Sequence, residues 1–223
     1  DHYLGELFGV DPAKLRSFDM PRYLELSRVT SGEMMARTFS EWRSSHSRNA
    51  GGLIWFFKDL WAATGWGIMD HHGMPKAAYY QLKRLWKSQQ LTITDEGTDG
   101  LHLHLVNETG DSVDGFMEVQ LLREPNMVTA KQEIAVKAGP NSKQTLSLDE
   151  ILGSFHDVNY AYRFGPQKHH VVIATWLNSE REPVSEAIHF TRARDPEAHV
   201  LCSDAISIEA EALSGGSFRV LLT

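Results

Sequence analysis

The hydrophobic pattern of this chain changes near residue 88, and that change constrains its fold more than any other feature. Before it, apolar residues recur at helical spacing, from Tyr23 to Trp42 and again from Ala77 to Trp86. After it, short segments alternate apolar and polar residues with a period of two, and Gly, Pro and Asn turns separate them. The sequence therefore predicts α/β organisation followed by an all-β region.

In the first region, Asp19 and Pro21 are typical of a helix start, and we expect one long helix that could break at Gly32. Residues 53–57 (LIWFF) form an apolar run of strand length, which suits a strand covered on both faces in a parallel sheet. Pro75 then opens a second helical pattern. Helix, strand, loop and helix in succession are typical of α/β folds.

In the second region the alternating segments predict an antiparallel sandwich over residues 91–192. These segments are residues 101–106 (LHLHLV), 116–121 (FMEVQL), 134–137 (IAVK) and 171–176 (VVIATW). After a charged linker at residues 191–198, residues 205–210 and 218–222 offer two further strands. We therefore divide the chain into residues 1–90, 91–192 and 193–223, and the last part either completes the sandwich or begins another β domain.

Charge and composition exclude several classes of protein. The formal net charge is -7 and no basic cluster is interleaved with aromatics, which argues against nucleic acid as a partner. The apolar runs are too short to span a bilayer. Cys202 is the single cysteine, so neither an internal disulfide nor a cysteine-based zinc site can form, and the compartment stays open. Residues 1–6 lack an initiator Met and a leader, so we expect a longer parent protein.

Indole rings and carboxylates gather just after the predicted strand. Trp55, Asp59, Trp61, Trp66 and Asp70 fall within sixteen residues, at the strand end that carries the active site in α/β barrels. A sugar suits such a surface, because its C–H face stacks on an indole while carboxylates accept hydrogen bonds from its hydroxyls. The alternative is that the tryptophans pack a core.

These motifs resemble the end of the catalytic barrel of a glycoside hydrolase family 2 β-mannosidase. The resemblance rests on residues 52–61 (GLIWFFKDLW), 65–70 (GWGIMD) and 73–80 (GMPKAAYY), with residues 39–43 (FSEWR) similar to the preceding helix. It implies the C-terminal part of a (β/α)8 barrel over residues 1–90. It also implies an immunoglobulin-like sandwich after residue 90.

The resemblance also assigns expected roles. Trp55 matches a tryptophan of the sugar-binding wall, and Asp59 and Trp61 match the positions just beyond it, so these three are the expected substrate-binding residues. Trp66, Asp70 and Lys76 are expected to support the loop, with Asp70 and Lys76 joined by a charge-assisted contact. The implied substrate of the parent enzyme is a terminal β-mannoside or manno-oligosaccharide, cleaved with retention and without a cofactor. The remainder of the parent chain is the other expected partner.

The catalytic carboxylates are not found in this sequence. Retaining glycosidases need two carboxylates about 5 to 5.5 Å apart, and the family takes both from earlier barrel strands. Glu6 lacks the flanking residues of the nucleophile motif, and we interpret it as a solvated loop carboxylate. We therefore expect no catalytic residue here and an inactive fragment. Two alternatives stay open: the sandwich is a noncatalytic spacer or carbohydrate-binding module, or the parent cleaves another β-glycoside. No exposed aromatic stripe is evident in the sandwich, which favours a spacer over a binding module.

Three histidine clusters raise the question of a metal: His71-His72, His102 with His104, and His169-His170. Adjacent residues of a strand point to opposite faces, and an i, i+2 pair supplies two ligands where zinc needs three or four. We expect no metal site. His102 and His104 are predicted to lie on a solvated face, opposite Leu101, Leu103 and Leu105.

Overall fold

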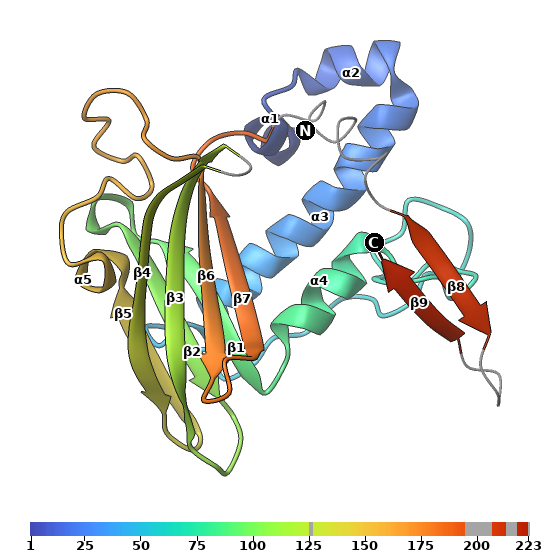
Figure 1. Ribbon diagram of the computed structural model, residues 1–223. Helices are drawn as coiled ribbons and strands as arrows, with labels where there is room; N and C mark the ends of the chain where they lie inside the picture. The colour runs from blue at the N-terminus through green and yellow to red at the C-terminus, as the bar shows by residue number, and fades with distance from the viewer. Residues whose placement is uncertain (125–126, 195–206, 213–217, 223) are drawn as a thin grey trace.

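The computed structural model describes residues 1–124, 127–194, 207–212 and 218–222, and it combines a helical part with an antiparallel β part (Figure 1). The helices of the first part are α1 (His2–Phe8), α2 (Pro12–Phe18), α3 (Met20–Arg43) and α4 (Ala77–Leu85). In Figure 1 the long helix α3 runs between the sandwich and the loop that precedes α4. Among the described residues, no helix is long and apolar enough to cross a membrane.

The predicted start of the long helix is confirmed. The Asp19 carboxylate accepts a hydrogen bond from the Arg22 backbone N–H at 3.0 Å, which satisfies one of the donors left free at a helix start. The helix does not break at Gly32. A Cβ there would lie 3.2 Å from the Ala78 backbone nitrogen, so the glycine allows α3 and α4 to pack closely. Their shared core contains Phe39, Leu82 and Leu85.

The strand predicted at residues 53–57 is not present. Within residues 1–88, the β pairing consists of isolated bridges from Lys58 to Met69 and from Met69 to Pro75. A buried parallel strand needs hydrogen-bonding neighbours and cover on both faces. The segment lacks both, because no described strand pairs with it and Leu53 is 98% exposed. The (β/α)8 barrel therefore remains a prediction.

Two antiparallel sheets form the β part. The first has the strand order β1 (Gln89–Asp95), β2 (Leu101–Asn107), β5 (Ser142–Ser147). The second has the order β4 (Met127–Ala138), β3 (Val113–Glu124), β6 (Val171–Asn178), β7 (Pro183–Phe190). The turn η1 (Gly97–Asp99) joins β1 to β2, and the short helix α5 (Leu148–Leu152) follows β5. Figure 1 shows the two sheets as stacked layers.

The sheets share one hydrophobic core, as the alternating pattern predicts. Leu101, Leu103 and Leu105 of β2 are fully buried in it, together with Met117 of β3 and Trp176 of β6. Because successive side chains of a strand point to opposite faces, this inward set explains the period of two in each segment.

The C-terminal strands form a sheet of their own. Strands β8 (Ile208–Ala212) and β9 (Phe218–Leu222) pair antiparallel, and in Figure 1 they lie beside the α4 end of the helical part rather than on the sandwich. The two C-terminal strands were expected either to complete the sandwich or to begin another β domain. The described strands β8 and β9 do not join either sheet of the sandwich. Cys202, residues 205–206 and half of the predicted linker (residues 195–198) lie outside the described residues.

Arg43, at the end of α3, ties the helical part to the sandwich. Its guanidinium donates hydrogen bonds to the backbone carbonyls of Leu85 and Lys87, which lie at the end of α4 and just beyond it. The same group forms a 3.0 Å ion pair with Glu108, just after β2. A planar guanidinium with several donors can make these contacts at once. Both helices are thereby held against the start of the sandwich.

Candidate functional site

The loop that carries the predicted site, residues 52–76, is held by backbone hydrogen bonds between three short stretches. The Asp59 N–H donates to the Met69 carbonyl at 3.0 Å, and the Met69 N–H donates to the Phe57 carbonyl at 3.1 Å. The Lys76 N–H donates to the Ile68 carbonyl at 2.9 Å. Ile68 is buried against α3 and α4, so the underside of the loop rests on the helices.

Asp59 is the centre of this loop. It is 7% exposed, its carboxylate lies 2.5 Å from Lys76 Nζ, and it accepts a 2.7 Å hydrogen bond from the Gly67 N–H. The hydrogen bond from Lys76, and secondarily the one from Gly67, holds the Asp59 pKa below its ordinary value against the opposing effect of burial. Each oxygen of the Asp59 carboxylate thus already accepts a hydrogen bond from within the protein.

Two glycines make this arrangement possible. A Cβ at Gly65 would lie 2.2 Å from Asp59 Oδ1, and a Cβ at Gly67 would lie 2.6 Å from the same atom. Any larger residue at either position would therefore displace the carboxylate. The sequence pattern singled out Trp66, which lies between these glycines. The glycines themselves were the residues that could have indicated the Asp59–Lys76 ion pair.

Asp70 shapes the next turn rather than meeting Lys76. Its Oδ1 accepts hydrogen bonds from the N–H groups of His72 at 2.9 Å and Met74 at 2.8 Å. The Met74 hydrogen bond, followed by that of His72, lowers the Asp70 pKa despite partial desolvation. The expected contact between Asp70 and Lys76 is therefore wrong, because Lys76 pairs with Asp59 instead.

The three tryptophans of the loop face solvent. Trp55 is 72% exposed, Trp61 67% and Trp66 69%. The alternative that they pack a core therefore does not hold in this structure. The Trp55 and Phe56 rings lie 5.2 Å apart between centroids. An indole fixed on an anchored loop and open to solvent is suited to stacking against the apolar face of a ligand.

Glu6, the one other acidic candidate, lies on α1 and not in a loop. It forms a 3.2 Å contact with His2 one turn earlier, and both side chains are largely exposed. Nothing in this arrangement brings it to the tryptophan loop. Its interpretation as a solvated carboxylate is confirmed, although its predicted loop setting is wrong.

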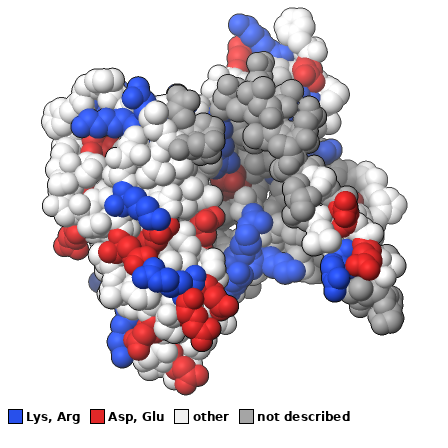
Figure 2. Space-filling model, viewed as in Figure 1, with Lys and Arg blue, Asp and Glu red and all other residues white. Residues whose placement is uncertain are grey.

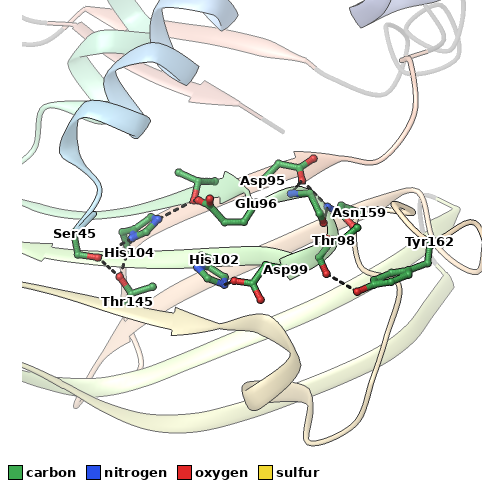
Figure 3. A network of polar contacts seen from close by, with 12 residues as sticks. Ser45, Asp95, Glu96, Thr98, Asp99, His102, His104, Thr145, Asn159 and Tyr162 are labelled. Atoms are coloured by element: carbon green, nitrogen blue, oxygen red, sulfur yellow. Dashed lines mark hydrogen bonds and ion pairs between the residues drawn. The ribbon is translucent and has the colours of Figure 1, made fainter. Parts of the chain in front are cut away.

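His104 is buried, in contrast to the solvated position predicted for it. The segment just after α3 covers this face of the sheet, and His104 is fully excluded from solvent beside Ser45 and Thr145 (Figure 3). Its Nδ1 lies 3.1 Å from Thr145 Oγ1 and its Nε2 lies 2.8 Å from Thr94 Oγ1. Burial, with smaller contributions from His46 and His102, lowers the His104 pKa from 6.5 to about 4.

His102, the second residue placed on that face, lies at its edge. Its side chain is largely covered and contacts Asp99 of η1 at 3.3 Å (Figure 3). The prediction of a fully solvated face fails because the amphipathic pattern of β2 does not reveal that the segment after α3 packs on the outer face. Among the described residues, no group of three or more His, Cys, Asp or Glu side chains is placed to hold a metal ion.

Comparison with curated proteins finds relatives that match part of this chain. The chain is 27% identical over 124 residues to β-mannosidase B of Emericella nidulans, a match covering 54% of this chain and 15% of that protein. It is 28% identical over 103 residues to β-mannosidase B of Thermothelomyces thermophilus, covering 44% of this chain and 12% of that protein. Over these stretches the chain is similar in sequence to part of each β-mannosidase. No protein-family model matches it.

Solved structures show a similar fold. The β-D-mannosidase of Dictyoglomus thermophilum superposes with a TM-score of 0.66 at 20% identity, covering 87% of this chain and 22% of that one. An exo-chitosanase of Amycolatopsis orientalis, solved with PNP-β-D-glucosamine, gives a TM-score of 0.62 at 14% identity, covering 100% of this chain and 23% of that one. At these identities the likeness concerns the fold alone. Like the curated relatives, both proteins are several times longer than the part this chain matches.

Proposed function

We propose that this chain is part of a larger glycoside hydrolase that removes terminal β-mannosyl residues with retention, and that residues 52–76 form part of its sugar-site wall. One observation carries the proposal: Trp55, Trp61 and Trp66 are exposed on a loop that a buried ion pair anchors. The likeness in sequence to β-mannosidase B proteins supports mannose as the sugar.

Trp55 is the proposed stacking platform, and Trp61 a second aromatic contact. Exposed indoles offer large apolar area with few rotatable bonds, so they bind a ligand with little loss of conformational entropy. The anchored backbone adds to this preorganisation. Asp59 takes a different role from the one the resemblance implies. Because its carboxylate is occupied by Lys76 and Gly67, we propose that it supports the loop, as do Trp66, Asp70 and Lys76.

The carboxylates that perform the chemistry are proposed to come from other parts of the larger enzyme. Asp59 and Asp70 each accept internal hydrogen bonds, so neither is suited to act as nucleophile or acid/base. In this proposal residues 1–90 belong to a (β/α)8 barrel, residues 91–192 to an immunoglobulin-like sandwich and residues 193–223 to a further β element. The 223-residue chain alone is then inactive.

The test is a Trp55→Ala substitution in the longer enzyme that contains this chain. Loss of a stacking platform that is used in the transition state is expected to lower kcat/KM on p-nitrophenyl β-mannoside about tenfold or more, which corresponds to about 1.4 kcal/mol. Phe18→Ala, which truncates an exposed ring on α2, is the matched control and should leave kcat/KM unchanged.

An unchanged kcat/KM for Trp55→Ala would show that Trp55 does not contribute to the sugar-binding site. The same assay with the p-nitrophenyl β-glucoside, β-galactoside and β-glucosaminide decides the sugar. Faster cleavage of any of these than of the mannoside would overturn the mannosidase proposal while leaving the glycosidase assignment in place.

A further inference from the structure

The segment between α5 and β6 carries a cluster of exposed aromatic rings. Phe155, Tyr162 and Phe164 are 58%, 42% and 71% exposed. Tyr162 stacks on Phe164 with ring centroids 5.4 Å apart, and Phe155 meets Tyr162 edge-on at 5.4 Å. Single exposed aromatics are ordinary, but three in mutual contact form a patch that calls for a function. The sequence showed no exposed aromatic stripe in the sandwich, and this cluster corrects that expectation.

The segment that bears the cluster is anchored at both the core and the neighbouring turn. Val158 is buried in the sandwich core, and the Asp157 carboxylate accepts hydrogen bonds from the Tyr162 and Arg163 N–H groups at 3.2 and 2.8 Å. The Tyr162 hydroxyl donates to the Thr98 carbonyl of η1 at 2.7 Å, as Figure 3 shows. The rings are therefore presented by a preorganised loop.

Beside the rings lies a pocket of about 330 Å³, bounded on its other side by strands β3 and β4. Phe155, Tyr160 and Phe164 supply its aromatic wall, while Gln167 and Lys168 add polar side chains. This volume lies at the small end of the range for ligand sites, which is about 300 to 1,000 Å³. It suits a ligand of one or two rings that combines apolar faces with hydrogen-bonding groups.

The pocket is distinct from the tryptophan loop. In Figure 1 the segment after α5 lies on the outer side of the sandwich, whereas residues 52–76 lie beyond α3 and α4. The face of the sandwich that Figure 2 shows is mixed in charge, with Lys and Arg interspersed among Asp and Glu. A strongly ionic ligand would leave the aromatic wall unused. A pyranose uses both parts of the pocket, because its C–H face stacks on a ring while its hydroxyls pair with the Lys168 ammonium and with the side-chain carbonyl oxygen of Gln167, whose amide N–H groups already donate to Thr191.

We propose that residues 154–168 form a second carbohydrate-binding site, which takes one or two units of a β-linked hexopyranose chain. The site requires no catalysis and does not depend on the Trp55 loop. Only the choice of a mannose-based probe rests on the proposed function. The site would hold a polysaccharide close to the larger enzyme and so raise the local concentration of chain ends.

The test uses the isotopically labelled 223-residue chain and follows backbone amide shifts by NMR during separate titrations with β-1,4-mannotriose, cellotriose and chitotriose. Saturable shifts in residues 154–168 with at least one of these sugars are expected. The double variant Phe155→Ala/Phe164→Ala should weaken that binding about tenfold or more, because it removes two of the three rings of the aromatic wall. Phe164→Ala alone provides a milder change should the double variant fail to fold.

Two control variants separate this site from the rest of the chain. Phe18→Ala removes an even more exposed ring elsewhere, and Trp55→Ala removes the proposed wall of the other site, so neither should alter the shifts in residues 154–168. Absence of shifts there with all three sugars, or unchanged binding in the folded Phe164→Ala and double variants, overturns the proposal. Either result leaves the kinetic test of Trp55 untouched, so the two proposals fail independently.

Discussion

The buried histidine of β2 makes the stability of this chain depend on pH in a predictable direction. His104 is enclosed by Ser45, Thr94 and Thr145, all of which offer hydroxyl groups to its ring nitrogens. These hydroxyl groups can form hydrogen bonds with both nitrogens of a neutral imidazole, because a hydroxyl can either donate or accept. Protonation would instead place a positive charge in a site that is closed to solvent.

The sign and size of the effect follow from the pKa. Burial lowers the His104 pKa from 6.5 to about 4, so the unfolded chain binds this proton first as the pH falls. The stability that the neutral His104 contributes is fully present above about pH 6.5 and is lost progressively toward about pH 4. At about 1.4 kcal/mol per pH unit the whole interval corresponds to about 3 kcal/mol, of which about 2 kcal/mol is lost between about pH 7 and about pH 4.5.

The measurement compares urea unfolding of the wild-type chain and His104→Gln at about pH 7 and about pH 4.5, followed by far-UV circular dichroism. The variant should be less stable at the higher pH, yet lose about 2 kcal/mol less than the wild type on acidification. His189, whose pKa burial also lowers to about 4, is present in both chains, so its effect cancels in the comparison. His2→Gln, an exposed histidine on α1, is the control. Equal losses of stability in the wild type and His104→Gln would refute the reasoning.

Two further substitutions test the loop and the core. Lys76→Met removes the partner of Asp59, so the Asp59 pKa should rise toward its ordinary value in an NMR titration and limited proteolysis within residues 58–75 should accelerate; Lys83→Met, an exposed lysine of α4, should change neither. Leu103→Ala should lower the free energy of unfolding in urea by about 2 to 5 kcal/mol, whereas Leu53→Ala, at a fully exposed position, should leave it within about 0.5 kcal/mol.

Elements whose own side chains decide their structure were predicted from the sequence. The cap at Asp19 and the alternation of Leu101, Leu103 and Leu105 act within one helix or one strand, so the periodicity carries the whole signal. Strands β1, β5 and β7 were not predicted as separate elements. Each has its inward face filled by a mixture of polar and apolar residues, and pairing with β2 or β6 defines it instead.

The sequence groups the residues of the candidate site, but it does not reveal the contacts within the loop, and the sugar site itself stays a prediction. The tryptophans were recognisable as a group because they lie close in sequence. The Asp59–Lys76 pair was not, because it joins residues 17 apart across a turn whose geometry depends on Gly65 and Gly67. His104 shows the same limit, since the segment that buries it, after α3, is 59 residues away in sequence from the strand it covers.

Residues 53–57 form no strand in this chain, yet the way their side chains divide between the helices and solvent is compatible with the proposed barrel. Ile54 packs toward the α3 and α4 core, whereas Leu53, Trp55 and Phe57 face solvent. That division is the one expected of a barrel strand, whose outer side chains meet helices and whose inner ones fill the barrel. Contiguous apolar surface of this kind marks an interface in a soluble protein. Ile54 is therefore already packed against the helices, although Phe56 is still 45% exposed. In the proposed larger enzyme, neighbouring strands would cover the exposed residues of this segment and leave Trp55 open only toward the sugar.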